Sequence, residues 1–194
     1  MPSTRFVPPS LRALALSIVV LCSAGCERAI FGVINRGVAP PSASVVFDAG
    51  HQLALDVYRA AGAKRGTPVV VFFYGGSWKR GQRTQDAFVG RRLAEHGVLT
   101  LVADYRTWPR AGFTGFMGDA AGAVAWAKAN AAEYGGDPER LYIAGHSAGA
   151  QIAGLLGTDA RYLARAGVST KQIAGVITPE TTIGAPHQKC GHGF

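Results

Sequence analysis

The chain has 194 residues, of which 48% are hydrophobic and 16% charged, a composition typical of one globular domain with enough apolar residues for a core. Its formal net charge of +8 at pH 7 raises the question of nucleic acid as a partner. The basic residues form no stripe with interleaved aromatic residues, and the sequence contains no known nucleic-acid-binding module. We therefore expect no nucleic acid partner. The positive charge instead favours a mild attraction to anionic membrane surfaces.

The N-terminus has the pattern of an export signal. Two arginines precede an apolar run over residues 13–22, which is shorter than the ~20 residues that span a bilayer, and small residues follow. The segment 23–26, Ser-Ala-Gly-Cys, resembles the lipobox of bacterial lipoproteins and points to lipidation of Cys26. Plain secretion with cleavage after Gly25 is the alternative. We predict a signal peptide over 1–25 and an exported protein that is either membrane-anchored or periplasmic.

The segment after the signal is rich in glycine, proline and serine. Residues 26–44 are therefore predicted to form a tether between membrane and domain. The domain is predicted to begin with an antiparallel hairpin over Val45–Asp48 and Leu53–Arg59. Beyond it, strand-like and helix-like segments alternate, which predicts an α/β domain with a mostly parallel sheet over 45–178.

The next segment, Pro68–Phe73, is continuously apolar and β-branched, as in a strand buried on both faces of a parallel sheet. The residues Tyr74-Gly75-Gly76-Ser77-Trp78 follow it. Two glycines at a strand end leave backbone N–H groups uncovered by a Cβ. Such groups can stabilise the oxyanion of an acyl transfer, where losing one donor costs about 10²–10³ in rate. Gly75 and Gly76 are candidate donors, with an ordinary Gly-Gly turn as the alternative.

Two more helices and a strand are predicted before the central motif. A helix over Thr84–His96 precedes a strand over Val98–Ala103, and a longer helix covers Phe116–Tyr134. The loop between that strand and that helix contains Trp108. Together with Trp78, it is a candidate for lining a substrate pocket, and the alternative is that both are core aromatics.

The segment Gly145-His146-Ser147-Ala148-Gly149 joins a strand-like run, Leu141–Ala144, to a helix-like run of small residues. A serine on a sharp strand-to-helix turn is exposed to a base, and the turn admits only small residues two positions before and after it. The order strand, G-x-S-x-G, helix therefore makes Ser147 the candidate nucleophile. Ala148 would offer a third N–H group to the oxyanion.

Four segments in this order resemble an α/β-hydrolase: Tyr74–Trp78, Ala103–Arg106, Tyr134–Pro138 and Gly145–Ala150. They are most similar to the carboxylesterase and hormone-sensitive-lipase-like group, which carries an H-G-G oxyanion loop. The resemblance implies a mostly parallel sheet with helices on both faces, an ester substrate, and acyl transfer to the serine followed by hydrolysis. It implies no metal or cofactor. Tyr74 departs from the group because it stands where histidine is usual.

The C-terminal tail does not continue this pattern. The predicted elements end with a sixth strand over Ile173–Thr178, whereas the resemblance implies an acid and a histidine after two further strands. One interpretation is that Glu180 with His187 or His192 completes a triad from the tail. The other is a truncated gene product whose residues 179–194 come from a shifted reading frame. The clustering of His187, Cys190 and His192 lacks a fourth ligand, so no metal site is expected.

The sequence thus favours an exported serine esterase, weakly active or inactive if it lacks the C-terminal strands. A non-catalytic, membrane-tethered protein of the same fold is the competing hypothesis, and a peptidase or formamidase is a further alternative. The sequence indicates no particular protein partner.

Overall fold

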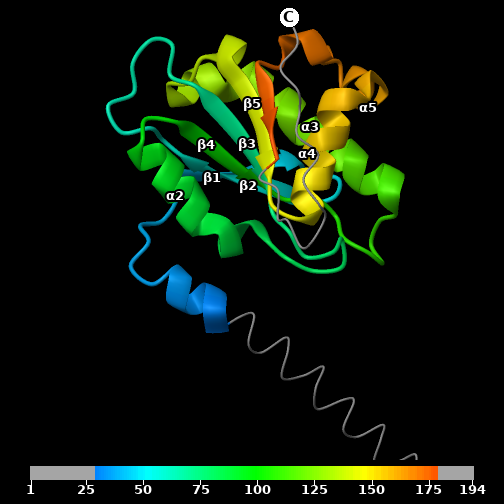
Figure 1. The fold of residues 1–194 in the computed structure, drawn as a ribbon, viewed down its shortest axis with the longest axis horizontal. Helices are drawn as coiled ribbons and strands as arrows, with labels where there is room; N and C mark the ends of the chain where they lie inside the picture. The colour runs from blue at the N-terminus through cyan, green and yellow to red at the C-terminus, as the bar shows by residue number, and fades with distance from the viewer. Residues whose placement is uncertain (1–28, 179–194) are drawn as a thin grey trace, which may run out of the picture.

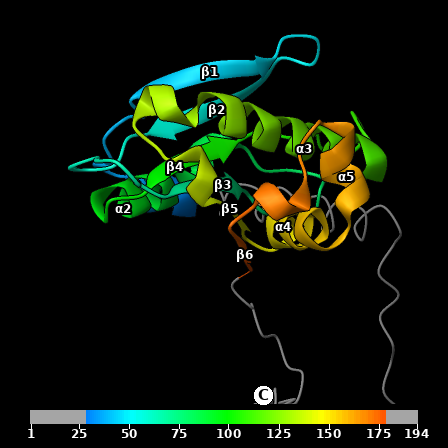
Figure 2. The same cartoon turned by 90° about the horizontal axis from the view of Figure 1, so that it is seen from above.

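A computed structural model describes residues 29–178, and these form a mixed six-stranded sheet flanked by helices (Figures 1 and 2). The strand order is β1-β2-β4-β3-β5-β6. The pairs β3–β4, β3–β5 and β5–β6 are parallel, whereas β2 runs antiparallel between β1 and β4. The predicted α/β class with a mostly parallel sheet is confirmed.

The strands are β1 (Ala43–Asp48), β2 (Leu53–Tyr58), β3 (Val69–Phe73), β4 (Leu99–Ala103), β5 (Leu141–Gly145) and β6 (Gly175–Ile177). The α-helices are α2 (Ala87–Glu95), α3 (Phe113–Asn130), α4 (Ala148–Thr158) and α5 (Ala160–Arg165). Short 3-10 turns are η1 (Arg83–Asp86), η2 (Ala131–Tyr134), η3 (Pro138–Arg140) and η4 (Thr170–Gln172). Residues 29–34 form one further helical segment.

Strand β3 is apolar throughout because helices cover both faces of the sheet. Val69, Val71 and Phe73 of β3 join the larger core with α3, α4 and α5. The alternate residues Val70 and Phe72 join a smaller core under α2. This period-two division between two layers explains why Pro68–Phe73 reads as a continuous apolar run.

Several boundaries differ from the sequence-based prediction. Within the predicted tether over 26–44, residues 29–34 are helical, and β1 begins at Ala43, so it includes the last two residues of that range. The predicted helix over Thr84–His96 divides into η1 and α2, and the one over Phe116–Tyr134 starts earlier and ends in η2. In the part of the chain that the structure describes, no helix is both long and apolar enough to cross a membrane.

Candidate active site

Ser147 lies at the turn between β5 and α4, where its backbone adopts φ 53° and ψ −116°. A positive φ is uncommon for a residue with a side chain and is maintained only where the surroundings enforce it. The side chain is exposed, while its neighbours Ala148 and Gly149 are buried. This is the geometry of a nucleophile elbow, as the G-x-S-x-G pattern predicts.

The two glycines of the motif are required by close backbone contact. A Cβ at Gly145 would lie 2.3 Å from the carbonyl carbon of Gly149. A Cβ at Gly149 would lie 2.0 Å from the backbone oxygen of Phe73, at the end of β3. Because these separations are far below van der Waals contact, no side chain fits at either position. The elbow is thus fixed by the approach of α4 to the ends of β3 and β5.

The loop after β3 packs directly against the elbow. A Cβ at Gly75 would lie 3.2 Å from Cβ of Ser147 and 2.9 Å from Nδ1 of His146. Gly76, Ser77 and Trp78 follow with φ values of 124°, 54° and 56°. Three consecutive residues of positive φ form a tight turn, which explains why the sequence has glycine at its first position.

The three predicted oxyanion donors lie around this junction. Gly75 and Gly76 belong to the loop, and Ala148 is the first residue of α4. Their N–H groups donate to no acceptor among residues 29–178. Helix N-termini leave such donors unpaired, and an anionic ligand satisfies them well.

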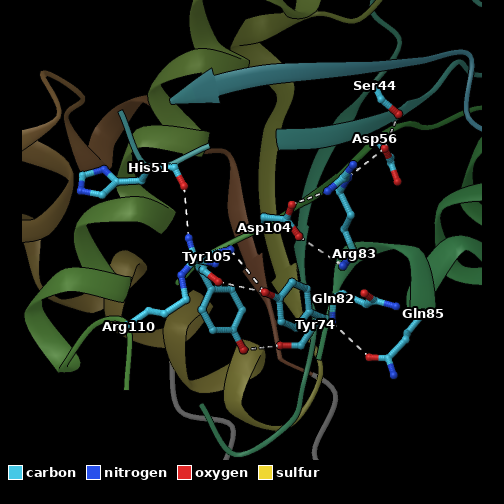
Figure 3. A network of polar contacts seen from close by, with 10 residues as sticks. All are labelled: Ser44, His51, Asp56, Tyr74, Gln82, Arg83, Gln85, Asp104, Tyr105 and Arg110. Carbon is cyan, nitrogen blue, oxygen red and sulfur yellow. Dashed lines mark hydrogen bonds and ion pairs between the residues drawn. The ribbon is translucent and has the colours of Figure 1, made fainter. Parts of the chain in front are cut away.

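Two tyrosines hold the loop Tyr74–Trp78, the predicted oxyanion loop, through reciprocal hydrogen bonds (Figure 3). Tyr74 Oη donates to the backbone oxygen of Tyr105, and Tyr105 Oη donates to that of Tyr74, both at 2.9 Å. The rings stack with centroids 4.4 Å apart. Burial raises the pKa of both hydroxyls, so both remain protonated donors at neutral pH. Tyr74 therefore fixes the loop at the position where histidine is usual, and the role of Tyr105 was missed by the sequence analysis.

An ion-pair cluster fastens the segment that follows this loop (Figure 3). Arg83 Nε donates to Asp56 Oδ1 at 3.0 Å, and Arg83 Nη1 pairs with Asp104. The buried carboxylate of Asp56 also accepts from the hydroxyl of Ser44 at 2.5 Å. One arginine thus connects η1 to β2 and to the carboxyl end of β4.

Asp86 is a buried carboxyl group beside the elbow. It is 6% exposed and accepts no hydrogen bond from any residue in the described range. Burial raises the pKa of Asp86 to about 6, against a smaller opposing influence of His146. His146 itself lies against Gly75. We therefore expect Asp86 to change its charge at mildly acidic pH, a property that no local sequence pattern indicated.

A second carboxyl cluster lies beside the loop after β4. Oxygen and nitrogen atoms of Asp48, His51 and Asp119 lie within 4.8 Å of one another, a spacing that a metal ion could use. Both carboxylate oxygens of Asp119 already accept from the guanidinium of Arg106, at 2.7 and 2.8 Å. Because the guanidinium of Arg106 already neutralises the carboxylate of Asp119, this ion pair stabilises the loop after β4. We assign no metal to the cluster.

The tryptophans differ in setting. Trp78 packs against the main core, with its ring stacked on Phe116 at a centroid distance of 6.3 Å. Trp108 is 59% exposed, and its backbone N–H donates to the backbone oxygen of Trp78 at 2.7 Å. Two described cavities lie at the opposite, amino-terminal edge of the sheet, and neither tryptophan lines them. Trp78 is partly buried against the core and Trp108 is exposed, and a pocket role for either residue stays a prediction.

The remaining predicted site residues lie outside the described range. They are the acid and base candidates Glu180, His187 and His192 and the lipidation site Cys26.

Known proteins match this chain over the same region that contains these motifs. The family described as BD-FAE matches residues 55–174, which include the oxyanion loop and the elbow. The chain belongs to the BD-FAE family. Among solved structures, a Thermogutta terrifontis esterase with bound propionate is similar to this chain, with a TM-score of 0.56 and 30% sequence identity. That match covers 60% of this chain and 45% of the esterase.

Curated relatives of this BD-FAE chain are also esterases. A probable isoprenylcysteine alpha-carbonyl methylesterase of Oryza sativa subsp. japonica is 43% identical over 110 residues, 57% of this chain and 26% of the relative. Esterase LipC of Mycobacterium tuberculosis is 37% identical over 115 residues, 57% of this chain and 28% of LipC. The matched region thus spans only about a quarter of each relative's length.

Proposed function

We propose that this chain is a serine carboxylesterase whose nucleophile is Ser147. The observation that supports this most strongly is the junction of Ser147 with Gly75. An exposed serine in a strained backbone conformation lies against a loop whose N–H groups have no acceptor within the described residues. The family and the esterase relatives agree with this assignment.

The reaction would proceed by acyl transfer. Ser147 Oγ attacks the ester carbonyl carbon, a new O–C bond forms, and the N–H groups of Gly75, Gly76 and Ala148 stabilise the oxyanion. A histidine base takes the hydroxyl proton and returns it to the departing alcohol. Water then attacks the acyl-serine and releases the acid. The base is assigned to the C-terminal part of the protein, where His187 and His192 are the candidates in this chain.

Fluorophosphonate labelling of the purified protein tests this function, together with hydrolysis of p-nitrophenyl butyrate. We expect Ser147→Ala to abolish both signals. The control variant Ser169→Ala removes a serine that caps η4, far along the chain, and should leave both unchanged. Labelling that persists in Ser147→Ala would exclude this nucleophile. A wild-type protein that binds esters without labelling would support the non-catalytic alternative.

We further propose that the protein is exported and anchored by a lipid on Cys26. The N-terminal signal pattern and the lipobox-like segment support this. Mass spectrometry of the N-terminal peptide should find Cys26 as the first residue with acyl chains attached. An unmodified peptide that begins at Cys26 would indicate plain secretion instead.

A further inference from the structure

A short apolar helix at the start of the described chain has almost no cover from the domain. Residues 29–34 read Ala-Ile-Phe-Gly-Val-Ile. Ile30, Val33 and Ile34 are 56%, 72% and 45% exposed. Their spacing of three and four places them on neighbouring positions of one helix face. An isolated exposed apolar residue is ordinary, but three on one short helix form a patch that favours a partner.

This helix is fastened to the domain at one point. Asn35 Nδ2 donates to the backbone oxygen of Gln85 at 2.8 Å, and Asn35 Oδ1 accepts from the N–H of Phe88 at 3.0 Å. The amide thereby joins η1 to the first turn of α2. The C-terminal end of helix 29–34 is therefore held next to η1 and α2.

Basic side chains lie next to the apolar residues. Arg36, Arg91 and Arg92 line the same cavity as Ile34, between the segment after the helix and α2. Both α2 arginines pair with Glu95 near the surface, at 3.3 and 3.5 Å, and their side chains stay 44% and 74% exposed. We call Ile30, Val33, Ile34, Arg36, Arg91 and Arg92 the N-terminal face. Apolar residues bordered by arginines match the apolar interior and anionic headgroups of a lipid surface.

The position of the proposed anchor also favours a membrane. Cys26 precedes Ala29 by three residues, which can span at most about 10 Å. A lipid on Cys26 would therefore hold the helix at the headgroup region. An anchor with more than one acyl chain already attaches the chain stably, so a second contact on the domain would set its orientation on the membrane.

We propose that the N-terminal face docks on an anionic bilayer and sets the orientation of the domain on it. This inference rests on the proposed anchor at Cys26 for its biological setting, but the face itself can be tested without the anchor. Figure 1 shows helix 29–34 at the end of the molecule remote from α5, so α5 supplies matched control positions. The segment that Asn35 holds also leads from the oxyanion loop to α2.

Thiol protection measures the docking of the full chain directly. The variant Val33→Cys is alkylated with a water-soluble maleimide, with and without vesicles of phosphatidylcholine and phosphatidylglycerol. The extent of alkylation is measured separately for each cysteine-containing peptide. We expect vesicles to slow the reaction at position 33 by about tenfold or more. Val46→Cys, at a 59% exposed position of β1, should react equally in both conditions.

The charges are tested separately. Arg91→Gln with Arg92→Gln should weaken binding to the anionic vesicles by about fivefold for each arginine, while Arg161→Gln with Arg165→Gln on α5 should not. Equal reactivity at positions 33 and 46 on vesicles would overturn the proposal. Protection that appears without vesicles and grows with protein concentration would overturn it in favour of a second copy. Acylation of Cys26 and labelling of Ser147 are separate readouts, so their failure leaves this result interpretable.

Discussion

At the scale of single residues, the candidate site depends on glycines at which an added Cβ would clash with a neighbouring backbone. Gly145 and Gly149 were predicted from the motif alone, because the elbow needs small residues at these two positions. The structure adds the reason, which is that each glycine faces the backbone of another segment. Asp86, in contrast, could not be predicted, because its burial results from long-range packing that no local pattern records.

The first prediction compares two glycines of α4. Gly149→Ala places a methyl group 2.0 Å from the oxygen of Phe73, so we expect loss of fluorophosphonate labelling and unfolding at lower denaturant concentration. Gly154→Ala meets only Thr178 Cγ2 at 3.8 Å and should gain up to ~1 kcal/mol in helix stability. Labelling and urea unfolding measure both variants. Equal behaviour of the two would show that the predicted backbone contact does not exist.

The second prediction concerns Asp86. Its folded-state pKa of about 6 exceeds the ordinary value of 3.8, so the folded state binds the proton more tightly than the unfolded state. The stability contributed by this group is therefore full below pH ~4 and is lost as pH rises to ~6, at a cost of about 3 kcal/mol. Asp86→Asn should increase the free energy of unfolding at pH 7.5 and leave it unchanged near pH 4.

Asp159, at the surface, serves as the control because its pKa is shifted in the opposite direction. Hydrogen bonds from Arg161 lower the pKa of Asp159 to about 2, so its contribution is present at neutral pH and is lost in acid. Asp159→Asn should therefore lower stability at pH 7.5. Urea unfolding from pH 4 to 8 compares both variants with the wild type. A pH profile of Asp86→Asn that is parallel to the wild type would contradict the assigned burial effect.

At the scale of elements, polar side chains set how the strand ends and loops are joined. Sequence reasoning found β3, the helix that contains α2, and the elbow, because each has a local signature of apolar period or turn residues. It missed the Tyr74–Tyr105 pair and the Asn35 contact, whose partners lie 31 and 50 residues apart. Such pairings depend on the strand order, which a single sequence does not reveal. The position of the loop Tyr74–Trp78 after β3 was thus predicted, but the contacts that support it were not.

The third prediction tests the Arg83 cluster. Arg83→Gln leaves the buried carboxylate of Asp56 and the neighbouring Asp104 without their cation, so we expect a loss of about 3 kcal/mol of stability. The exposed pair of Arg161 with Asp159 is the control, and Arg161→Gln should cost less than ~1 kcal/mol. Chemical unfolding at pH 7.5 gives both values. Similar losses would show that the cluster contributes no more than a surface pair.

At the scale of the whole molecule, the sheet has two unlike edges. Strand β1 is antiparallel to β2 and has an irregular register between Val46 and Asp48, which discourages further pairing. Strand β6 pairs with β5 and with no other strand among residues 29–178, and its Val176 and Ile177 are 37% and 49% exposed. An apolar edge of this kind is a template for self-association.

The fourth prediction follows from this difference. Ile177→Lys should reduce aggregation, measured by light scattering during incubation at 37 °C, because a charge on β6 opposes pairing of another strand. Val46→Lys adds the same charge at the opposite edge and should change aggregation little. If Val46→Lys reduced aggregation more than Ile177→Lys, β1 would be the edge through which the protein self-associates.

The reciprocal tyrosine bonds have a further consequence for the order in which this protein is made. The loop, both tyrosines, the elbow and α4 all precede residue 159 in the chain. During synthesis, the ribosome delivers them before the C-terminal segment, in which we propose that the proton-accepting histidine lies. We expect the oxyanion donors to be in place while Ser147 still lacks its base and is unreactive. The nascent chain would then not attack esters before the protein is complete.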